Sequence, residues 1–236
     1  MSSQHPDWEN GWLRQATRWP SPNFGPRPDQ ACIDLIVVHS ISLPPGQYGG
    51  QAVQALFTNR LDWDAHPYYQ QIRGLEVSSH FYIRRDGELW QFVSCDDRAW
   101  HAGRSHYRGR DNCNDDSIGI ELEGLEGDSF EPQQYAALAQ LCRQLASRYP
   151  IAHIAGHEHV APGANKTPER ASTGHCFRHF CWIFHVSVFP EPTPLNRVSK
   201  KYFSGTSKPL ARPHRTPDFM RHKAASPKSR ARPLWH

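Results

Sequence analysis

Residues 117–123 read SIGIELE, an alternation of apolar with small or acidic side chains that is typical of a β-strand. A second run, IDLIVV at residues 33–38, is apolar and rich in β-branched side chains, and it predicts a buried strand that ends at His39. Residues 151–155 predict a third short strand, which leads into Gly156 and His157. These three segments form the expected centre of a β-sheet.

The segments between these strands predict helices and one hairpin. Residues 51–59 carry apolar side chains at helical spacing, and residues 132–149 form a longer amphipathic pattern that begins with a proline. Residues 80–85 and 89–93 flank Asp86-Gly87, a strong signal for a β-hairpin. Strands and helices therefore alternate from residue 33 to 157, and the predicted fold class is α/β, with a mixed central sheet flanked by helices.

Composition limits the kind of protein this is. The length of 236 residues suits one α/β domain with an extra segment. No run of about 18 apolar residues is present, so no membrane span is expected. The first residues lack a basic patch followed by an apolar stretch, so a secretory signal is not expected either. The six cysteines are scattered without a CxxC pair, which favours reduced thiols in a reducing compartment.

The net charge of +4 hides two unlike pieces. Residues 168–236 hold 13 of the 27 basic residues, 3 of the 23 acidic residues and 9 of the 20 prolines. That segment has a net charge of +10, while residues 1–167 have a net charge of −6. We therefore predict a boundary near Thr167, with residues 180–236 mostly disordered.

Four residues could together carry hydrolytic chemistry. Catalytic zinc sites commonly use three protein ligands and leave one position for water, while a carboxylate removes the proton of that water. The candidates are His39 and His157 as metal ligands, Glu121 as base and Lys166 as the cation that holds a developing oxyanion. Each also has a structural interpretation, because a strand-end histidine is often a satisfied core residue and a lone lysine is often a surface charge.

Longer motifs favour the functional interpretation. The matching segments are residues 38–46 (VHSISLPPG), 83–88 (IRRDGE), 98–103 (RAWHAG), 113–124 (CNDDSIGIELEG) and 156–163 (GHEHVAPG), with GWL at 11–13 and PSPN at 20–23 near the start. In this order they resemble the AmpD family, the 1,6-anhydro-N-acetylmuramyl-L-alanine amidases. The resemblance covers residues 10 to 167 almost without a break.

This resemblance implies a fold shared with peptidoglycan recognition proteins and phage-type amidases. It also implies one Zn²⁺, held by two histidines and an aspartate. His39 and His157 match the two histidines, Glu121 matches the catalytic glutamate, and Lys166 matches the lysine of the family's Lys-Thr-Asp-Pro-Gly motif. Residues 10–167 would then form the zinc amidase domain.

The resemblance further implies a substrate and a location. Trp100 and His101 lie where the family lines its substrate cleft. The family hydrolyses the lactyl amide of anhydro-muropeptides in the cytoplasm during cell-wall recycling. The expected partner is therefore a small muropeptide, with no nucleic acid and no membrane, and the chain is expected to be a monomer.

The chain departs from the family immediately after Lys166-Thr167. Pro168 and Glu169 follow where the aspartate ligand should stand, so the amidase domain is incomplete at its C-terminal end. Read from the third base of each codon, the segment from residue 166 can encode Asp-Pro-Gly-Thr-Gly-Ile-Asp-Trp-Pro-Leu-Leu. This reading restores the aspartate and a later Asp-Trp of the family pattern. Our hypothesis is that residues 168–236 are an out-of-frame translation.

Several alternatives follow from the missing aspartate. The possible replacement ligands are Glu169, His159, His175 and Cys176. Without a third ligand the chain would be an inactive or purely muropeptide-binding remnant. A third possibility is nucleic-acid binding by the basic tail, although that tail has no recognised binding fold. A serine hydrolase is disfavoured because no Gly-x-Ser-x-Gly elbow is present, and no cysteine lies in a Cys–His protease context.

Overall fold

A six-stranded mixed sheet organises residues 6–161, the part of the chain that the computed structural model describes. Its strand order is β12-β5-β11-β6-β7-β3. The strands are β3 (Thr17–Arg18), β5 (Leu35–Ile41), β6 (Phe81–Ile83), β7 (Leu89–Gln91), β11 (Ser117–Glu123) and β12 (His153–Gly156). The pairs β12·β5, β5·β11, β11·β6 and β7·β3 are parallel, whereas β6 and β7 are antiparallel.

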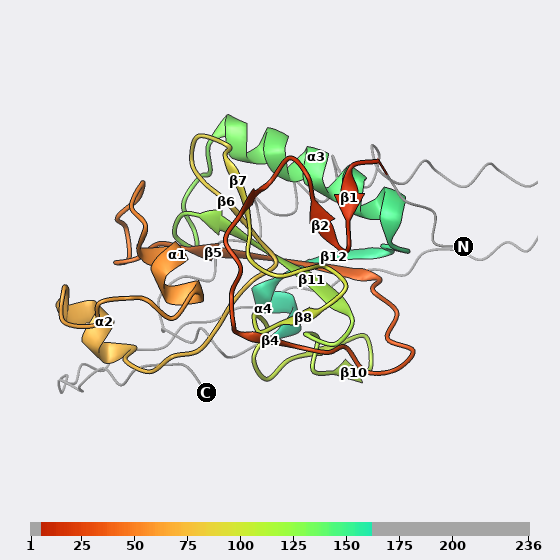
Figure 1. Ribbon diagram of the computed structural model, residues 1–236, viewed down its shortest axis with the longest axis horizontal. Helices are drawn as coiled ribbons and strands as arrows, with labels where there is room; N and C mark the ends of the chain where they lie inside the picture. The colour runs from red at the N-terminus through yellow and green to blue at the C-terminus, as the bar shows by residue number, and fades with distance from the viewer. Residues whose placement is uncertain (1–5, 162–236) are drawn as a thin grey trace, which may run out of the picture. The chain divides into compact units, whose positions relative to one another are not determined.

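Four helices and three small ribbons complete the described part of the chain. The helices are α1 (Ala52–Phe57), α2 (Pro67–Gln71), α3 (Pro132–Arg148) and α4 (His157–Val160). The ribbons pair β1 (Trp8–Glu9) with β2 (Trp12–Leu13), β4 (Phe24–Gly25) with β8 (Arg98–Ala99), and β9 (His106–Tyr107) with β10 (Arg110–Asp111). In Figure 1, α3 runs along one side of the sheet, and α4 lies on the other side with the β4–β8 ribbon.

The two faces of the sheet are buried differently. Alternate residues of β5 and β11, such as Val38, Ile120 and Leu122, join the cluster formed with α3. The opposite face carries a cluster built around α1 and the aromatic residues Tyr82, Trp90 and Phe92. Because a strand sends successive side chains to opposite faces, His39 and Glu121 lie on the face away from α3. The fold therefore covers one face with a long helix and leaves the other to short elements.

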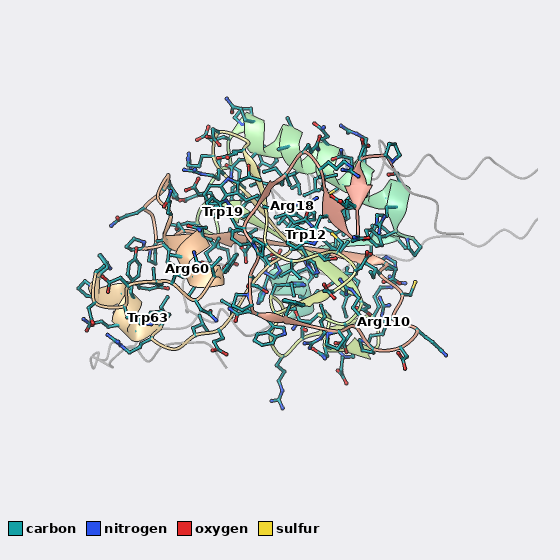
Figure 2. All side chains as sticks on the ribbon, viewed as in Figure 1. Trp12, Arg18, Trp19, Arg60, Trp63 and Arg110 are labelled. Carbon is teal, nitrogen blue, oxygen red and sulfur yellow. The ribbon has the colours of Figure 1, made fainter. Side chains whose placement is uncertain are left out.

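The N-terminal segment closes the far edge of the sheet. Figure 2 labels Trp12, Arg18 and Trp19 in this segment, and the guanidinium carbon of Arg18 is 5.5 Å from the centroid of the Trp12 ring. The Trp19 ring meets the Trp90 ring edge-on, with centroids 5.9 Å apart.

The β9–β10 ribbon is joined to the start of β5 by Arg110, which Figure 2 also labels. The Arg110 guanidinium donates to Asp34 at 2.8 Å and pairs with Asp116 at 2.9 Å.

Most elements expected from the sequence are present. The strand at 117–123, the hairpin around Asp86-Gly87 and the long helix are confirmed, and the α/β fold class with a mixed sheet is confirmed. The strand predicted to end at His39 in fact continues to Ile41, because β11 pairs with it as far as Glu123. His157 does not end a strand either, since it begins α4 directly after β12.

The predicted basic tail at 168–236 lies outside the described residues, as does the boundary near Thr167. Among the described helices, none combines the length and the apolar character that crossing a membrane requires.

Candidate active site

Three adjacent strands bring the candidate residues to one level of the sheet. β5 lies between β11 and β12, and its register places His39 opposite Glu121 and Val38 opposite Gly156. His157 follows Gly156 and therefore emerges beside His39. The Nδ1 atoms of the two histidines lie 2.9 Å apart. The predicted grouping of His39, Glu121 and His157 is thus present in the structure, at the carboxyl ends of parallel strands, where α/β proteins bind ligands.

His39 is enclosed by other histidine rings. Its Nε2 lies 3.0 Å from Nδ1 of His101, and Nε2 of His101 lies 3.2 Å from the hydroxyl of Ser117. Burial, together with the neighbouring His101 and His157, lowers the pKa of His39 well below its usual value. Burial also lowers the pKa of His101 and of His157. All three rings are therefore neutral at pH 7, which is the form that binds zinc.

Glu121 and Glu123 lie on the same face of β11 but have different surroundings. The carboxylate of Glu123 accepts hydrogen bonds from the backbone amides of Gly49 and Arg85. The Oε2 atom of Glu121 is buried and has no hydrogen-bond partner among residues 6–161. Burial alone raises the pKa of Glu121 to about 8. Below about pH 8 this buried group is mainly the neutral carboxyl, which can donate a proton, and its ionised form is a stronger base than an ordinary glutamate. Glu121 is therefore suited to proton transfer with a substrate or with water.

The histidine pair fits one part of a zinc site. Two neutral imidazoles meet through Nδ1 atoms, and the Nε2 atom of His157 is buried with no partner in the described part of the chain. Among residues 6–161, however, no group of three His, Cys, Asp or Glu residues is arranged to hold a metal. His159, one of the possible replacement ligands, instead faces Glu158 and the Gly156 amide. A third ligand would have to come from elsewhere in the chain.

Some predicted residues fall outside the described part. Lys166, the expected oxyanion cation, is one of them, as are Glu169, His175 and Cys176, the other possible replacement ligands. Their relation to the histidine pair stays a prediction.

A cavity of about 530 Å³ opens onto this cluster. Its lining includes His39, Glu121, His157 and both predicted substrate-contacting residues, Trp100 and His101. Six residues of one apolar cluster also line the cavity and are called its apolar wall here: Leu43, Leu56, Phe57, Tyr68, Ile72 and Val77. Trp100 is half-buried, and its backbone exchanges hydrogen bonds with Ser78, which fixes its place at the rim. A cavity of this size with a few converging polar groups is typical of a small-molecule site.

Sequence reasoning missed the residues that support the cluster. Ser117 contacts His101, and the side-chain oxygen of Asn114 accepts hydrogen bonds from the amides of His101 and Ala102 at 3.0 and 2.8 Å. Gly119 packs directly beneath the His101 ring, where a Cβ atom would lie 2.5 Å from its Cγ. All three belong to the CNDDSIGIELEG motif, so the motif itself was the available signal.

Comparison with known proteins identifies a family profile and sequence relatives that agree with one another. The protein-family profile described as N-acetylmuramoyl-L-alanine amidase matches residues 28–170. The 1,6-anhydro-N-acetylmuramyl-L-alanine amidase AmpD of Escherichia coli K12 is 48% identical over 188 residues, which are 78% of this chain and 98% of that protein. The enzyme of the same name from Salmonella typhimurium SL1344 is 49% identical over 162 residues, 68% of this chain and 87% of that protein.

Solved structures agree with these sequence relatives. A crystal structure of a selenomethionine derivative of AmpD has a TM-score of 0.66 and 47% identity, and the match covers 73% of this chain and 97% of that one. The solution structure of Citrobacter freundii AmpD has a TM-score of 0.55 and 45% identity, with 79% of this chain and 99% of that one covered. The similarity therefore extends over nearly the whole length of these relatives.

Proposed function

This chain belongs to the N-acetylmuramoyl-L-alanine amidase family, and from that premise we propose that it hydrolyses the amide between 1,6-anhydro-N-acetylmuramic acid and L-alanine in cell-wall recycling. The observation that carries this proposal is the convergence of His39, His157 and Glu121 on one cavity. Relatives of nearly 50% identity are named for the same reaction.

Each residue has a proposed role. His39 and His157 would hold Zn²⁺ through their Nδ1 atoms. Zinc, when bound, supplies Lewis-acid polarisation of the scissile carbonyl and lowers the pKa of water. Glu121 takes the proton of the attacking water and delivers it to the leaving amine. Lys166 would stabilise the oxyanion that develops on the carbonyl oxygen.

The cavity provides substrate binding. Trp100 at the rim would contact the sugar or the peptide, and the apolar wall around Leu56 and Tyr68 would keep water from the reacting amide. We propose action in the cytoplasm. Among the described residues Cys95 and Cys113 are buried thiols that form no disulfide, which fits a reducing compartment.

The amidase activity of this chain depends on whether it supplies a third zinc ligand. We propose that a loss of reading frame after Lys166-Thr167 replaced the family's Asp-Pro-Gly with Pro168, Glu169 and Arg170. The net charge changes from −6 over residues 1–167 to +10 over residues 168–236, and the later segment holds 9 of the 20 prolines, which supports this view. Two histidines alone bind zinc more weakly than three ligands in a fixed geometry. Weak zinc binding and low turnover are therefore expected.

The test uses the full chain. Zinc content is measured by elemental analysis, and peptide release from an anhydro-muropeptide is followed by chromatography. The triple variant Pro168→Asp, Glu169→Pro, Arg170→Gly restores the family motif, and we expect it to retain near-stoichiometric zinc and to gain turnover. Pro168→Asn with the same two other changes is the matched control, because asparagine is a poorer zinc ligand.

The outcomes separate the two proposals. Turnover and full zinc in the unaltered chain would contradict the expected weak zinc binding, because another residue would then serve as the third ligand, while supporting the amidase function. A restored variant that binds zinc without releasing peptide would contradict the amidase function. Sequencing of the gene around codons 165–170 gives an independent check, since an intact in-frame homologue with the same tail would exclude the frame loss.

A further inference from the structure

The hydroxyl of Ser117 has one hydrogen and two close polar neighbours. Its Oγ contacts the backbone carbonyl oxygen of Cys113 and also lies 3.2 Å from Nε2 of His101. Two oxygen atoms in such close contact need a hydrogen between them, and the hydroxyl is the only group of the pair that has one. Ser117 therefore donates to Cys113 and can only accept from His101.

This assignment determines the state of the His101 ring. A neutral imidazole carries a hydrogen on one nitrogen and a lone pair on the other. Since Nε2 of His101 donates to Ser117, its Nδ1 bears the lone pair. That Nδ1 lies 3.0 Å from Nε2 of His39, so His39 must donate from Nε2. The remaining nitrogen of His39, Nδ1, then bears a lone pair directed toward His157.

We infer that His101 and Ser117 are positioning residues that hold His39 in the tautomer whose Nδ1 lone pair faces the metal site. This inference deepens the proposed function and rests on it. Donation of the second ring nitrogen to a fixed acceptor orients a metal-binding histidine and selects its tautomer. Here the acceptor is another histidine, which is itself oriented by a serine and a backbone carbonyl.

The surrounding backbone holds His101 in place for this role. Asn114 accepts hydrogen bonds from the amides of both His101 and Ala102. Gly119 leaves room for the ring against β11, because a Cβ atom there would lie 2.5 Å from Cγ of His101. His101 is itself only 9% exposed, and both of its ring nitrogens are engaged inside the protein. The hydrogen bonds of its ring therefore act on the site through His39.

The two proposed zinc ligands differ in how the tautomer of each ring is held. The tautomer of His39 is set by this chain of contacts from Cys113. His157 has no such support in the described part of the chain, where its Nε2 has no hydrogen-bond partner. In the metal-free protein Nδ1 of His157 donates to His39, and a bound cation would require that hydrogen to move to Nε2.

The first test reads the tautomer directly in the metal-free full chain. Histidines are labelled with ¹⁵N, zinc is removed with a chelator, and long-range ¹H–¹⁵N spectra distinguish protonated from unprotonated ring nitrogens. His39 and His101 are assigned by the loss of their signals in His39→Asn and His101→Asn. We expect a hydrogen on Nε2 of both residues. A hydrogen on Nδ1 of His39 would overturn the inference.

A variant pair tests the chain of contacts. Ser117→Ala removes the acceptor, and we expect His39 and His101 to become mixtures of both tautomers. Ser94→Ala is the matched control, because Ser94 is also buried and donates to a backbone carbonyl, that of Asn10, away from the site. A His39 spectrum that is unchanged in Ser117→Ala, or changed equally in Ser94→Ala, overturns the inference.

The second test measures Zn²⁺ affinity by competition with a chromophoric chelator. Ser117→Ala is expected to bind Zn²⁺ about tenfold more weakly than the unaltered chain, within the usual range for loss of such a supporting contact. Equal affinity overturns the positioning role. If the unaltered chain takes up no Zn²⁺, the Ser117→Ala comparison is made in the variant with the restored aspartate. Absence of Zn²⁺ from that variant as well would contradict the proposed metal site, while the metal-free spectra still decide the tautomer.

Discussion

The Nδ1 atoms of His39 and His157 lie 2.9 Å apart although 118 positions separate the two residues in the chain. Their proximity follows from the parallel pairing of β5 and β12, in which Val38 lies opposite Gly156. Each histidine follows one of these two paired residues. The ring pair is thus set by the backbone register, and side-chain packing then orients the rings toward each other.

Because His39 and His157 lie together, we expect His157→Ala to abolish stoichiometric zinc binding. The loss is expected because a single histidine leaves too few ligands in the site. His153→Ala is the control, since His153 lies in β12 but packs against Tyr107 away from the ligand pair. Elemental analysis of the variants built on the chain with the restored aspartate gives the measurement. Zinc retention by His157→Ala would remove this residue from the site.

Glu121→Gln is expected to lower kcat by about 10²- to 10⁴-fold, which is the usual contribution of a general base. Glutamine has nearly the same shape but cannot accept the proton of water. Zinc content should remain unchanged, because Glu121 is not proposed as a ligand. Glu76→Gln, at an exposed position, is the control. The measurement is peptide release from an anhydro-muropeptide, and unaltered kcat would assign the base role elsewhere.

Gly119→Ala is expected to reduce the free energy of unfolding by about 1–3 kcal/mol, the typical cost of overpacking a buried site. The new methyl group would meet the His101 ring at 2.5 Å, so the ring must shift. Gly25→Ala is the control, because no atom lies within 4 Å of the added group there. Urea unfolding of both variants provides the comparison. Equal midpoints would show that the ring moves without cost.

Arg27→Lys is expected to destabilise the fold by about 2–4 kcal/mol, because lysine cannot replace a planar group that serves several acceptors. The Arg27 guanidinium donates to the backbone carbonyls of Cys95, Asn114, Asp115 and Ser117. It therefore joins the loop before β11 to the segment after β7. Arg104→Lys, at an exposed position, should change the urea midpoint little.

From the buried ring of His80 we expect the free energy of unfolding to depend on pH. Its Nδ1 accepts from the Gly119 amide, its Nε2 faces the Asp97 carbonyl and the Arg27 guanidinium, and its ring lies near that of His101. Burial, with Arg27 nearby, lowers its pKa to about 3. The unfolded state takes up a proton below about pH 6.5 and the folded state does not, so stability is present above that pH and falls as the pH drops toward 3.

The measurement compares urea unfolding at pH 7 and pH 5 for the unaltered chain and for His80→Asn, which keeps an acceptor for the Gly119 amide. His80 should account for about 2 kcal/mol of the loss at pH 5, so the variant should lose that much less. Identical pH slopes would show that His80 is already protonated when folded.

The strands and the longer helices could be predicted from the sequence because each produces a local pattern of apolar residues. Residues 117–123 alternate with period two, and residues 132–149 carry an apolar stripe with a proline at the first helical position. The short helix α2 and the ribbons β1–β2 and β9–β10 have too few residues to show a period. Tertiary contacts decide the conformation of these short elements, so the sequence alone did not predict them.

The sequence by itself determined the family, the mixed sheet and the residue types of the candidate site, because the motifs around His39, Glu121 and His157 are long and occur in order. Only the tertiary structure decided which nitrogen faces which, that Glu121 is left without a partner among the described residues while Glu123 is satisfied, and that Ser117 acts on His39 through His101. Such relations depend on distances of about 3 Å between segments far apart in the chain, and only strand register and packing set distances of that kind.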